Sequence, residues 1–346
     1  MANLVEYRQL GNSGLRVSVP IVGAMSYGSP EWLPWVLDEE QSLPILKAAW
    51  DRGINTIDTA NVYSNGESEK IIAKFIEQFN IPRNQIIILT KCYALVGSTP
   101  GLQTFLKPEL KNQQEYVNQS GLSRAAIFNA VDASLRRLKT PYIDLLQIHR
   151  FDQMVPVEET MKALHDLVQS GKVRYIGASS MRCWQFARMN EVAEKHGWTK
   201  FVSMQNEYSL LYREETFTQE REMNAYCKYN GIGLIPWAPV AAGSLCRPVD
   251  ANTTDRAESR KDHPPSQLSD VDKLIIGRVE ELAKRKGWTM TQVALTWVKM
   301  KVSSPIVGMS SVQRVEDNIV NGLTLTEEDT RYLEELYTPK PVRGHQ

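Results

Sequence analysis

The chain has 346 residues, 42% of them hydrophobic, and its 40 Lys and Arg balance its 40 Asp and Glu. A surface without one dominant charge gives nucleic acid or an acidic membrane little to bind, so a small molecule is the expected partner. The segment MANLVEYRQLG lacks the apolar run of a signal peptide, and no stretch of about 18 apolar residues could span a bilayer. We expect a cytoplasmic protein without a membrane partner.

Short β-rich runs alternate with amphipathic stretches, which is the pattern of repeated βα units around a parallel sheet. The chain begins with a predicted β-hairpin, VEYRQLG followed by LRVSVP. Eight further strands are predicted at residues 21–28, 54–60, 86–91, 142–149, 173–179, 201–207, 233–239 and 304–310. Eight strands with interleaved helices favour an α/β fold, a closed (β/α)8 TIM barrel, over an open doubly wound sheet. The whole chain, 1–346, is predicted to form this single barrel domain.

The helices between these strands are predicted from apolar residues at helical spacing. One series comprises Val157, Met161, Leu164 and Val168. Another helix precedes the strand at 142–149, and Ser123 is its predicted N-cap. The spacing therefore places a helix between successive strands, as a barrel requires.

Two long segments, 92–122 and 243–270, interrupt this alternation, and both leave from the carboxyl ends of strands. Loops of this length are usually functional or disordered. We expect the first to form a wall of a substrate pocket and the second to form a flap; the alternative is that both are mobile decoration. Residues 340–346 are predicted to be a solvated tail.

Ionisable side chains end three successive strands of the predicted barrel. Asp58 closes INTID, Lys91 closes IIILTK and His149 closes YIDLLQIH, while Tyr63 lies just beyond the first strand. Carboxyl ends of neighbouring parallel strands meet at one mouth, where barrel enzymes hold their active sites. Each residue alone has a structural explanation: a turn cap, a surface aromatic, a lysine reaching solvent or a core histidine. Their occurrence together, on strand ends, favours one active site.

These four groups suit the reduction of a carbonyl. A lysine beside an aspartate stays protonated, and its charge near a phenol lowers the tyrosine pKa. Tyr63 is therefore expected to act as an acid near neutral pH, which a tyrosine with the usual pKa near 10 does poorly. His149 can orient the carbonyl oxygen by a hydrogen bond. The set supplies a proton but no hydride, so a cofactor must supply the hydride.

The sequence resembles the aldo-keto reductase superfamily over nearly its whole length. The motifs that carry this resemblance are the strand ending in Lys91 and the segments GINTIDTANVYSNGESE at 53–69, IDLLQIHR at 143–150, GKVRYIGASS at 171–180, SMQNEYS at 203–209 and PIVGMSS at 305–311. The resemblance implies a catalytic tetrad consisting of Asp58, Tyr63, Lys91 and His149. It also implies hydride transfer from a nicotinamide cofactor, mostly NADPH, without a metal. Fungal members of the aryl-alcohol dehydrogenase and versiconal hemiacetal acetate reductase types look most similar.

The resemblance also assigns residues to the cofactor. Ser179, Ser180 and Gln205 match positions that bind the nicotinamide amide, although Ser180 replaces a more usual Asn. Trp237 matches an aromatic residue that stacks on the nicotinamide ring; alternatively it is a barrel-core Trp. The pyrophosphate loop is implied at Ala238, Pro239, Gly243, Ser244 and Leu245, with Ala242 where an arginine often appears. The adenosine end is implied at Gly308, Ser310, Arg314, Asp317 and Asn318, where a strand enters a helix.

Arg314 is the candidate partner for a 2′-phosphate, whose charge suits a guanidinium group. Alternatively, Arg314 is an ordinary solvated helix residue. The lysine that many NADPH-specific relatives place before this helix is missing. NADPH is therefore the expected cofactor, and NADH is not excluded.

Three aromatic residues are predicted to line an apolar substrate pocket: Trp32 and Trp35 after the first barrel strand, and Tyr93 after Lys91. We therefore expect an NADPH-dependent reductase of an aldehyde or ketone, with aromatic or polyketide-like carbonyl substrates. The alternative is a cofactor-binding regulatory subunit that resembles channel β-subunits and has little turnover. A glycosidase would need a second strand-end carboxylate, and Asp58 has no obvious acidic neighbour. The sequence does not decide between a monomer and a weak homo-oligomer.

Overall fold

The structure, a computed structural model, describes residues 5–214, 222–251, 258 and 268–343. Its centre is an eight-stranded parallel sheet in the order β10-β3-β4-β5-β6-β7-β8-β9. The strands are β3 (Ile21–Gly23), β4 (Thr56–Asp58), β5 (Ile87–Cys92), β6 (Ile143–Ile148), β7 (Val173–Ser179), β8 (Ser203–Gln205), β9 (Gly233–Leu234) and β10 (Ile306–Gly308). Backbone hydrogen bonds join the two ends of the sheet, from Ser303 N to Leu234 O (3.0 Å) and from Ile306 N to Pro236 O (2.9 Å). The predicted (β/α)8 fold is confirmed.

Several strands are shorter than predicted because the backbone turns away at the barrel mouth. The run at 21–28 is a strand only as far as Gly23 and continues as the 3-10 helix η1 (Ala24–Ser26). The run at 233–239 contributes β9 and one isolated bridge, from Trp237 to Glu207, and the backbone then turns at Ala238, which adopts a positive φ of 53°. The loop after each of these two runs therefore begins earlier in the sequence than predicted.

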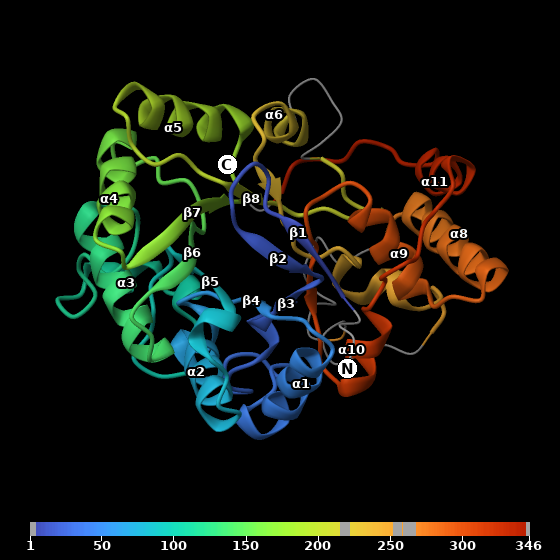
Figure 1. Cartoon of the computed structure of the whole chain (residues 1–346), viewed down its shortest axis with the longest axis horizontal. Helices are drawn as coiled ribbons and strands as arrows, with labels where there is room; N and C mark the ends of the chain where they lie inside the picture. Colours follow the sequence, from blue (N-terminus) through green and yellow to red (C-terminus); the bar gives the residue numbers. More distant parts are fainter. Residues whose placement is uncertain (1–4, 215–221, 252–257, 259–267, 344–346) are drawn as a thin grey trace.

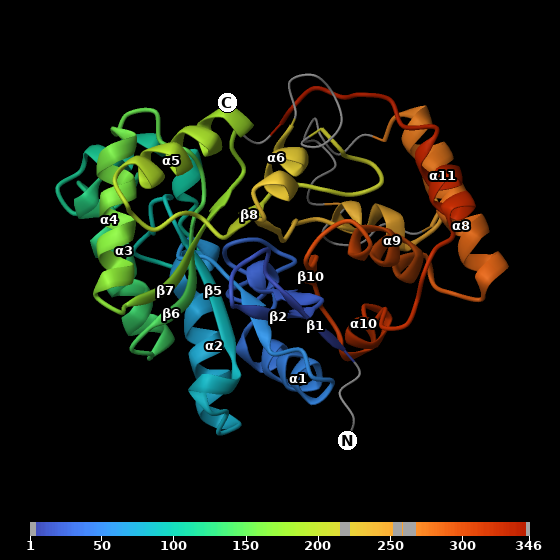
Figure 2. The same cartoon turned by 45° about the horizontal axis from the view of Figure 1, so that its top comes forward.

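Helices surround the barrel on its outside (Figure 1 and Figure 2). They are α1 (Glu39–Asp51), α2 (Glu67–Gln78), α3 (Arg124–Leu138), α4 (Val157–Gln169), α5 (Cys183–Lys195), α6 (Met223–Tyr229), α8 (Asp270–Lys286), α9 (Met290–Lys299), α10 (Val312–Asp317) and α11 (Glu327–Glu334). The Ser123 hydroxyl caps α3 by accepting a hydrogen bond from Ala126 N (3.2 Å), as predicted. Met161 and Leu164 of the predicted apolar series are fully buried, so α4 packs its apolar face on the strands.

The predicted N-terminal hairpin, β1 (Glu6–Gln9) paired with β2 (Arg16–Val19), lies at the centre of the ring of strands (Figure 1). Leu10 of its turn shares an apolar cluster with Leu89 and Leu145 from the barrel strands. At Gly11, with a φ of 57°, an added Cβ would lie 2.3 Å from Gly231 O, just before β9. The hairpin therefore covers the amino-terminal ends of the strands, and the mouth is at their carboxyl ends.

The first long segment, 92–122, is folded against the barrel. It contains the 3-10 helices η4 (Thr104–Leu106) and η5 (Pro108–Asn112), and Leu95, Leu110 and Tyr116 form an apolar cluster of their own. The second, 243–270, continues from η6 (Ala241–Cys246) to α8. Most of the flap predicted there lies outside the described residues.

The tail predicted at 340–346 contacts the rest of the protein as far as residue 343, although Pro341 and Arg343 are exposed. Lys340 forms an ion pair with Asp272 and donates to Leu211 O at 2.9 Å. Arg343 pairs with Glu207, two residues beyond β8, at 2.6 Å. Acidic partners distant in the sequence, one in α8 and one in the loop after β8, hold this segment, and a local sequence pattern does not reveal such partners.

We predict that Arg137→Met destabilises the fold by about 3–5 kcal/mol, because it leaves a buried carboxylate without its charge partner. Glu69 of α2 is fully buried, and it accepts hydrogen bonds from Arg137 Nε of α3 and from Thr90 Oγ1 of β5, both at 2.6 Å. Denaturant unfolding measures the change in the free energy of unfolding.

The matched control is Lys139→Met, which removes an exposed ion pair with Glu77 near the same end of α3. This pair should contribute about 0–1 kcal/mol. Equal losses of stability in the two variants would contradict the prediction.

Candidate active site

The strand register brings the predicted catalytic residues to one place at the carboxyl ends of β4, β5 and β6. Asp58, the last residue of β4, is opposite Leu89 of β5, two residues before Lys91. His149 follows β6, and its N–H donates to Cys92 O at 2.9 Å. Tyr63 begins the 3-10 helix η2 (Tyr63–Gly66) in the loop after β4. The structure thus groups all four residues at the mouth.

The Lys91 ammonium group is fully buried and has three acceptors. Its Nζ is 2.5 Å from Asp58 Oδ2, 2.8 Å from Thr59 O and 3.5 Å from the Tyr63 hydroxyl. An ammonium group has three hydrogens, so these contacts use all of them. The arrangement holds a positive charge beside the phenol in a place that water does not reach.

The pKa values of Lys91 and Tyr63 follow from burial and from their neighbours. Burial alone would lower the pKa of Lys91, but the charges of Asp58 and Tyr63 outweigh it and the pKa is raised. Burial raises the pKa of Tyr63, and Lys91 lowers it only in part, so the net shift is upward. The predicted effect of Lys91, which is to lower the pKa of Tyr63, is present, but burial outweighs it, so the phenol is protonated at neutral pH.

His149 is uncharged at neutral pH. Burial, together with the positive charges of Lys91 and Arg150, holds the pKa of His149 well below its usual value. Its ring lies edge-on to Tyr63, with the ring centroids 6.0 Å apart. A neutral imidazole still has one N–H to donate, so His149 can orient an oxygen atom beside the phenol without acting as a charged acid.

Two glutamines hold the other oxygen of Asp58. Gln147 Nε2 and Gln205 Nε2 each donate to Asp58 Oδ1 at 2.9 Å, and Gln205 Nε2 also donates to Gln147 Oε1 at 2.9 Å. Gln147 was not predicted as a site residue. The signal for it was the strand alternation, because Gln147 is two residues before His149 and so points to the same side of β6.

The residues assigned to the nicotinamide end lie next to this network. Ser179 Oγ donates to Gln205 O (2.9 Å), and Ser180 N donates to the same oxygen (3.2 Å). Trp237 Nε1 donates to Ser180 Oγ at 3.2 Å. Ser180 has a positive φ of 45° and Ala238 one of 53°, a backbone strain often found at binding sites. These side chains can therefore form one wall of a cofactor site.

The loop assigned to the pyrophosphate is irregular. Ala241, Ala242 and Gly243 have positive φ values, and Pro239, Gly243 and Ser244 follow Trp237 around the rim. Leu245 differs: its side chain is fully buried in the core and its N–H donates to Val240 O, so it offers a ligand neither group.

Arg247, which was not predicted, places a guanidinium group beside this loop. One of its guanidinium nitrogens lies 3.5 Å from where a Cβ of Gly243 would be. The charges of Arg247 and Arg314 both lower the pKa of the Cys246 thiol, although burial makes the net shift upward. Arg247 thus lies beside Gly243 of this loop, and a guanidinium group there suits a phosphate.

The residues assigned to the adenosine end surround the start of α10. Gly308 is exposed at the end of β10, and Arg314 is hydrogen-bonded to Ser310. Asp317 accepts from Gln313 at 3.2 Å. Asn318 is buried, and its Nδ2 has no hydrogen-bond partner among the residues that the structure describes. A buried donor needs an acceptor, and a purine ring nitrogen can provide one, so these residues fit an adenine nucleotide.

The chain belongs to the aldo/keto reductase family. The family model, described as the aldo/keto reductase family, matches residues 21–338. An aldo-keto reductase of Fusarium vanettenii is 55% identical over 99% of this chain and 93% of its own length. Versiconal hemiacetal acetate reductase of Aspergillus parasiticus is 49% identical over 98% of each chain. A putative aryl-alcohol dehydrogenase of Schizosaccharomyces pombe is 50% identical over 98% of this chain and 97% of its own.

Membership of the aldo/keto reductase family confirms the resemblance seen in the motifs. The protein is an oxidoreductase that acts on carbonyl or alcohol groups, and the family supports a nicotinamide cofactor. Within the described part of the chain, no helix is both long and apolar enough to cross a membrane.

One of the three aromatic residues predicted to line a substrate pocket lies next to the Tyr63 ring. Trp32 is buried, and its ring centroid is 6.3 Å from that of Tyr63. Trp35 is half-buried further along the same loop. Tyr93 is half-buried after β5 and packs against the core. Trp32 therefore lies beside the reacting phenol, whereas pocket contacts of Trp35 and Tyr93 stay predictions.

Asn65, also not predicted, links this site to the segment 92–122. Its Nδ2 donates to Thr99 O (2.8 Å), Pro100 O (3.2 Å) and Leu102 O (2.7 Å). Its Oδ1 accepts from Gly97 N at 2.8 Å. One amide two residues from Tyr63 thus satisfies four backbone groups of the wall. The Asn65-Gly66 pair indicated a turn in the sequence, but not which segment the amide would bind.

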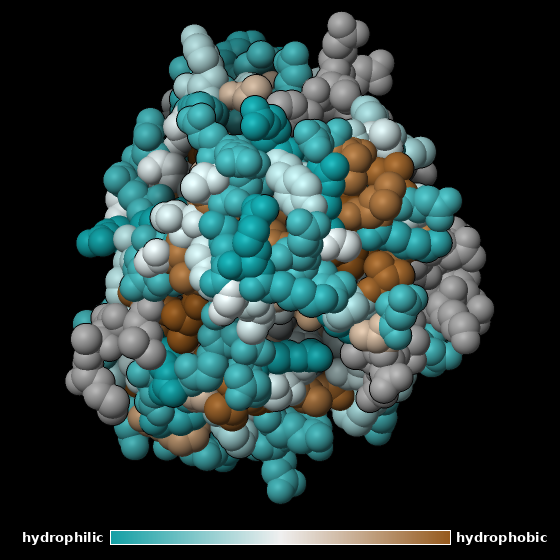
Figure 3. Space-filling model, turned by 90° about the vertical axis from the view of Figure 1, so that its right-hand side faces the viewer, coloured by the Kyte–Doolittle hydropathy of each residue, from teal (hydrophilic) through white to brown (hydrophobic). Residues whose placement is uncertain are grey.

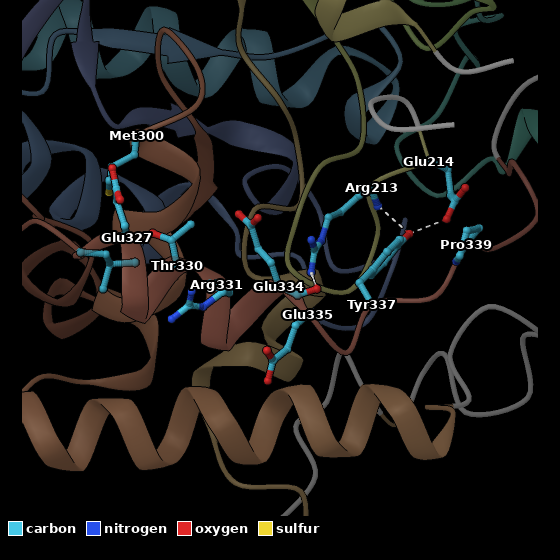
Figure 4. Close-up of a pocket in the computed structure, with 11 residues that line it drawn as sticks. Arg213, Glu214, Met300, Glu327, Thr330, Arg331, Glu334, Glu335, Tyr337 and Pro339 are labelled. Carbon is cyan, nitrogen blue, oxygen red and sulfur yellow. Dashed lines mark hydrogen bonds between the residues drawn. The ribbon is translucent and has the colours of Figure 1, made fainter. Parts of the chain in front are cut away.

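A hollow of about 740 Å³ lies elsewhere, between α11, the end of α9 and residues 213–214 and 337–339 (Figure 4). Its polar groups pair with one another: the Tyr337 hydroxyl donates to Glu214 at 2.5 Å and accepts from Arg213 N at 2.8 Å. On the face that carries α8 and α11, hydrophobic side chains form separate small patches (Figure 3). None of the predicted site residues lines this hollow, so it is distinct from the mouth of the barrel.

We predict that Asn65→Ala loosens the wall without removing catalytic groups. KM for a bulky aromatic aldehyde should change several-fold, whereas kcat/KM for a short aliphatic aldehyde should change little. Limited proteolysis should show faster cleavage within 97–106, because four backbone groups lose their partner. Asn118→Ala is the matched control. Asn118 has a φ of 60°, close to the 53° of Asn65, and lies within the segment 92–122. An identical response of the two variants would contradict the prediction.

Proposed function

We propose that this protein reduces an aldehyde or ketone to the alcohol with NADPH, using Tyr63 as the proton donor. The observation that carries the proposal is the contact of the buried Lys91 Nζ with the Tyr63 hydroxyl at 3.5 Å and with Asp58 at 2.5 Å. A cation next to a phenol stabilises the phenolate that forms when the proton leaves. The family and its reductase relatives support the same chemistry.

The proton side of the reaction follows from the tetrad. The substrate oxygen accepts hydrogen bonds from the Tyr63 hydroxyl and from the N–H of neutral His149. A bound dihydronicotinamide supplies the hydride to the carbonyl carbon. As negative charge develops on the oxygen, Tyr63 transfers its proton, and this is favourable even from a phenol of raised pKa because an alkoxide is the stronger base. Lys91 stabilises the phenolate that is left, and Asp58 holds Lys91.

Other residues support NADPH as the cofactor and an aromatic or polyketide-like compound as the substrate. Arg314 and Arg247 suit the 2′-phosphate and the pyrophosphate of NADPH, since guanidinium groups pair well with phosphate. Trp32, beside Tyr63, offers an apolar face for an aromatic or polyketide-like carbonyl compound. The names of two relatives, a versiconal hemiacetal acetate reductase and a putative aryl-alcohol dehydrogenase, favour such substrates. The regulatory-subunit alternative is not favoured, because it has no use for the complete tetrad.

We predict that Tyr63→Phe lowers the rate of carbonyl reduction by at least about 10²-fold while NADPH binding is retained. The substitution removes only the hydroxyl, so the pocket keeps its shape. Turnover is measured by NADPH oxidation with a panel of aldehydes, ketones and quinones, and binding by quenching of protein fluorescence. Full activity in the variant would exclude Tyr63 as the donor, and a wild-type protein that reduces nothing in the panel would favour the regulatory alternative.

We predict opposite pH dependences for the two directions of the reaction. Reduction needs the protonated phenol, so it persists through neutral pH and falls only as pH rises through the raised pKa of Tyr63. Alcohol oxidation needs the phenolate and rises over that range. Lys91→Met removes a charge that lowers this pKa, so the alkaline limb of the pH profile for reduction should move to higher pH in this variant. Lys91→Arg keeps the charge and should leave that limb in place. A limb that does not move in Lys91→Met would rule out this electrostatic coupling.

A further inference from the structure

Three buried side chains from alternate barrel strands form a hydrogen-bonded triangle under the candidate site. They are Asp58 of β4, Gln147 of β6 and Gln205 of β8, each no more than 2% exposed, and three contacts of 2.9 Å join them. Barrel interiors are normally filled by layers of bulky apolar side chains from alternate strands. A polar layer at this level costs desolvation unless its groups satisfy one another.

The chemistry of Asp58 determines how the two glutamines are oriented. Asp58 is ion-paired with Lys91, so it is a carboxylate and can only accept hydrogen bonds. Both amides must therefore turn their NH2 groups toward Asp58 Oδ1. The NH2 group of Gln205 then gives its two hydrogens to Asp58 and to Gln147 Oε1. The oxygen of Gln205 must point away from both, toward groups outside the triangle.

We infer that Gln147 is a positioning residue that fixes the amide of Gln205 for the cofactor and the carboxylate of Asp58 for Lys91. This rests on the proposed function, in which Gln205 contacts the nicotinamide and Lys91 serves the proton donor. Gln147 is held between its neighbours, because it is in register with Lys91 on one side and with Gly177 on the other. A Cβ at Gly177 would lie 3.3 Å from Gln147 Cγ and 2.3 Å from Ser203 Oγ, so β7 packs closely there.

Removal of Gln147 should free the amide of Gln205 to rotate. Gln205 would keep one fixed contact, to Asp58, and its NH2 and oxygen could exchange places at a smaller cost. For Gln147→Leu we expect the Kd for NADP+ to rise about tenfold. Isothermal titration calorimetry measures this affinity without any turnover.

Gln147→Glu provides the sharper test. A protonated Glu at this position can donate to Asp58 and accept from Gln205, so it reproduces both bonds of the glutamine. The ionised form places a second charge beside Asp58, which raises the pKa of the new carboxyl group. NADP+ affinity should therefore be close to wild type in acid and should weaken as pH rises through that pKa, while the wild-type affinity stays flat by comparison.

Gln185→Leu is the matched control. Gln185 of α5 is 1% exposed, and its Oε1 accepts from Arg182 N at 2.8 Å, outside the triangle. This variant should lose thermal stability but keep the NADP+ affinity. If Gln147→Leu behaves like this control and Gln147→Glu shows no pH dependence beyond that of the wild type, Gln147 is only structural and the inference falls alone. If the wild type itself binds no NADP+, the proposed function falls, and the inference falls with it.

Discussion

The buried ion pair between Lys91 and Asp58 is the constraint on which the site depends. The two side chains are 0% and 3% exposed, and two charges removed from water to this extent are tolerated only when their hydrogen-bonding groups are satisfied. The satisfying groups come from several strands: Thr59 after β4, Gln147 of β6 and Gln205 of β8. The strand register that closes the barrel is thus also the register that makes this pair tolerable. A shift of one residue in any of these strands would turn a partner away from the pair.

Some buried polar groups around the mouth have their partners within the protein, and others have none among the described residues. Within the tetrad, the Lys91 ammonium group and the Asp58 carboxylate have their hydrogen-bond partners within the protein. Among the residues assigned to the cofactor, Asn318 has a buried donor without a partner in the described part of the chain. The backbone nearby adopts positive φ values, which L-residues disfavour, at Ser180, Ala238, Ala241 and Ala242. A ligand with a complementary acceptor would therefore gain from a contact with the Asn318 amide, which is already oriented and unsatisfied.

Much of the fold and of the candidate site could be predicted from the sequence because both depend on local patterns. Alternating β-rich runs and helical spacing indicated the barrel. The ionisable residues Asp58, Lys91 and His149 at successive strand ends indicated the site. Contacts between distant segments could not be predicted, such as the amide of Gln147 on Asp58 or that of Asn65 on residues 97–102. The lowering of the pKa of Tyr63 by Lys91 could be predicted, but the larger opposite effect of burial could not, because a sequence does not state how deeply a loop residue is buried.

The turn that carries Tyr63 connects the chemistry to the choice of substrate. Ser64 Oγ accepts from Ser29 N at 3.1 Å, on the loop that bears Trp32, and Asn65 binds the wall segment 92–122. Glu69, in the helix α2 that follows this turn, accepts hydrogen bonds from Thr90, next to Lys91, and from Arg137 of α3. The loop that bears Trp32, the segment 92–122 and Tyr63 are therefore parts of one hydrogen-bonded unit. Substitutions that displace this turn as a whole will also move the phenol, so a change in specificity that arises in this way should be accompanied by a change in kcat, whereas loss of the single amide in Asn65→Ala leaves the phenol in place.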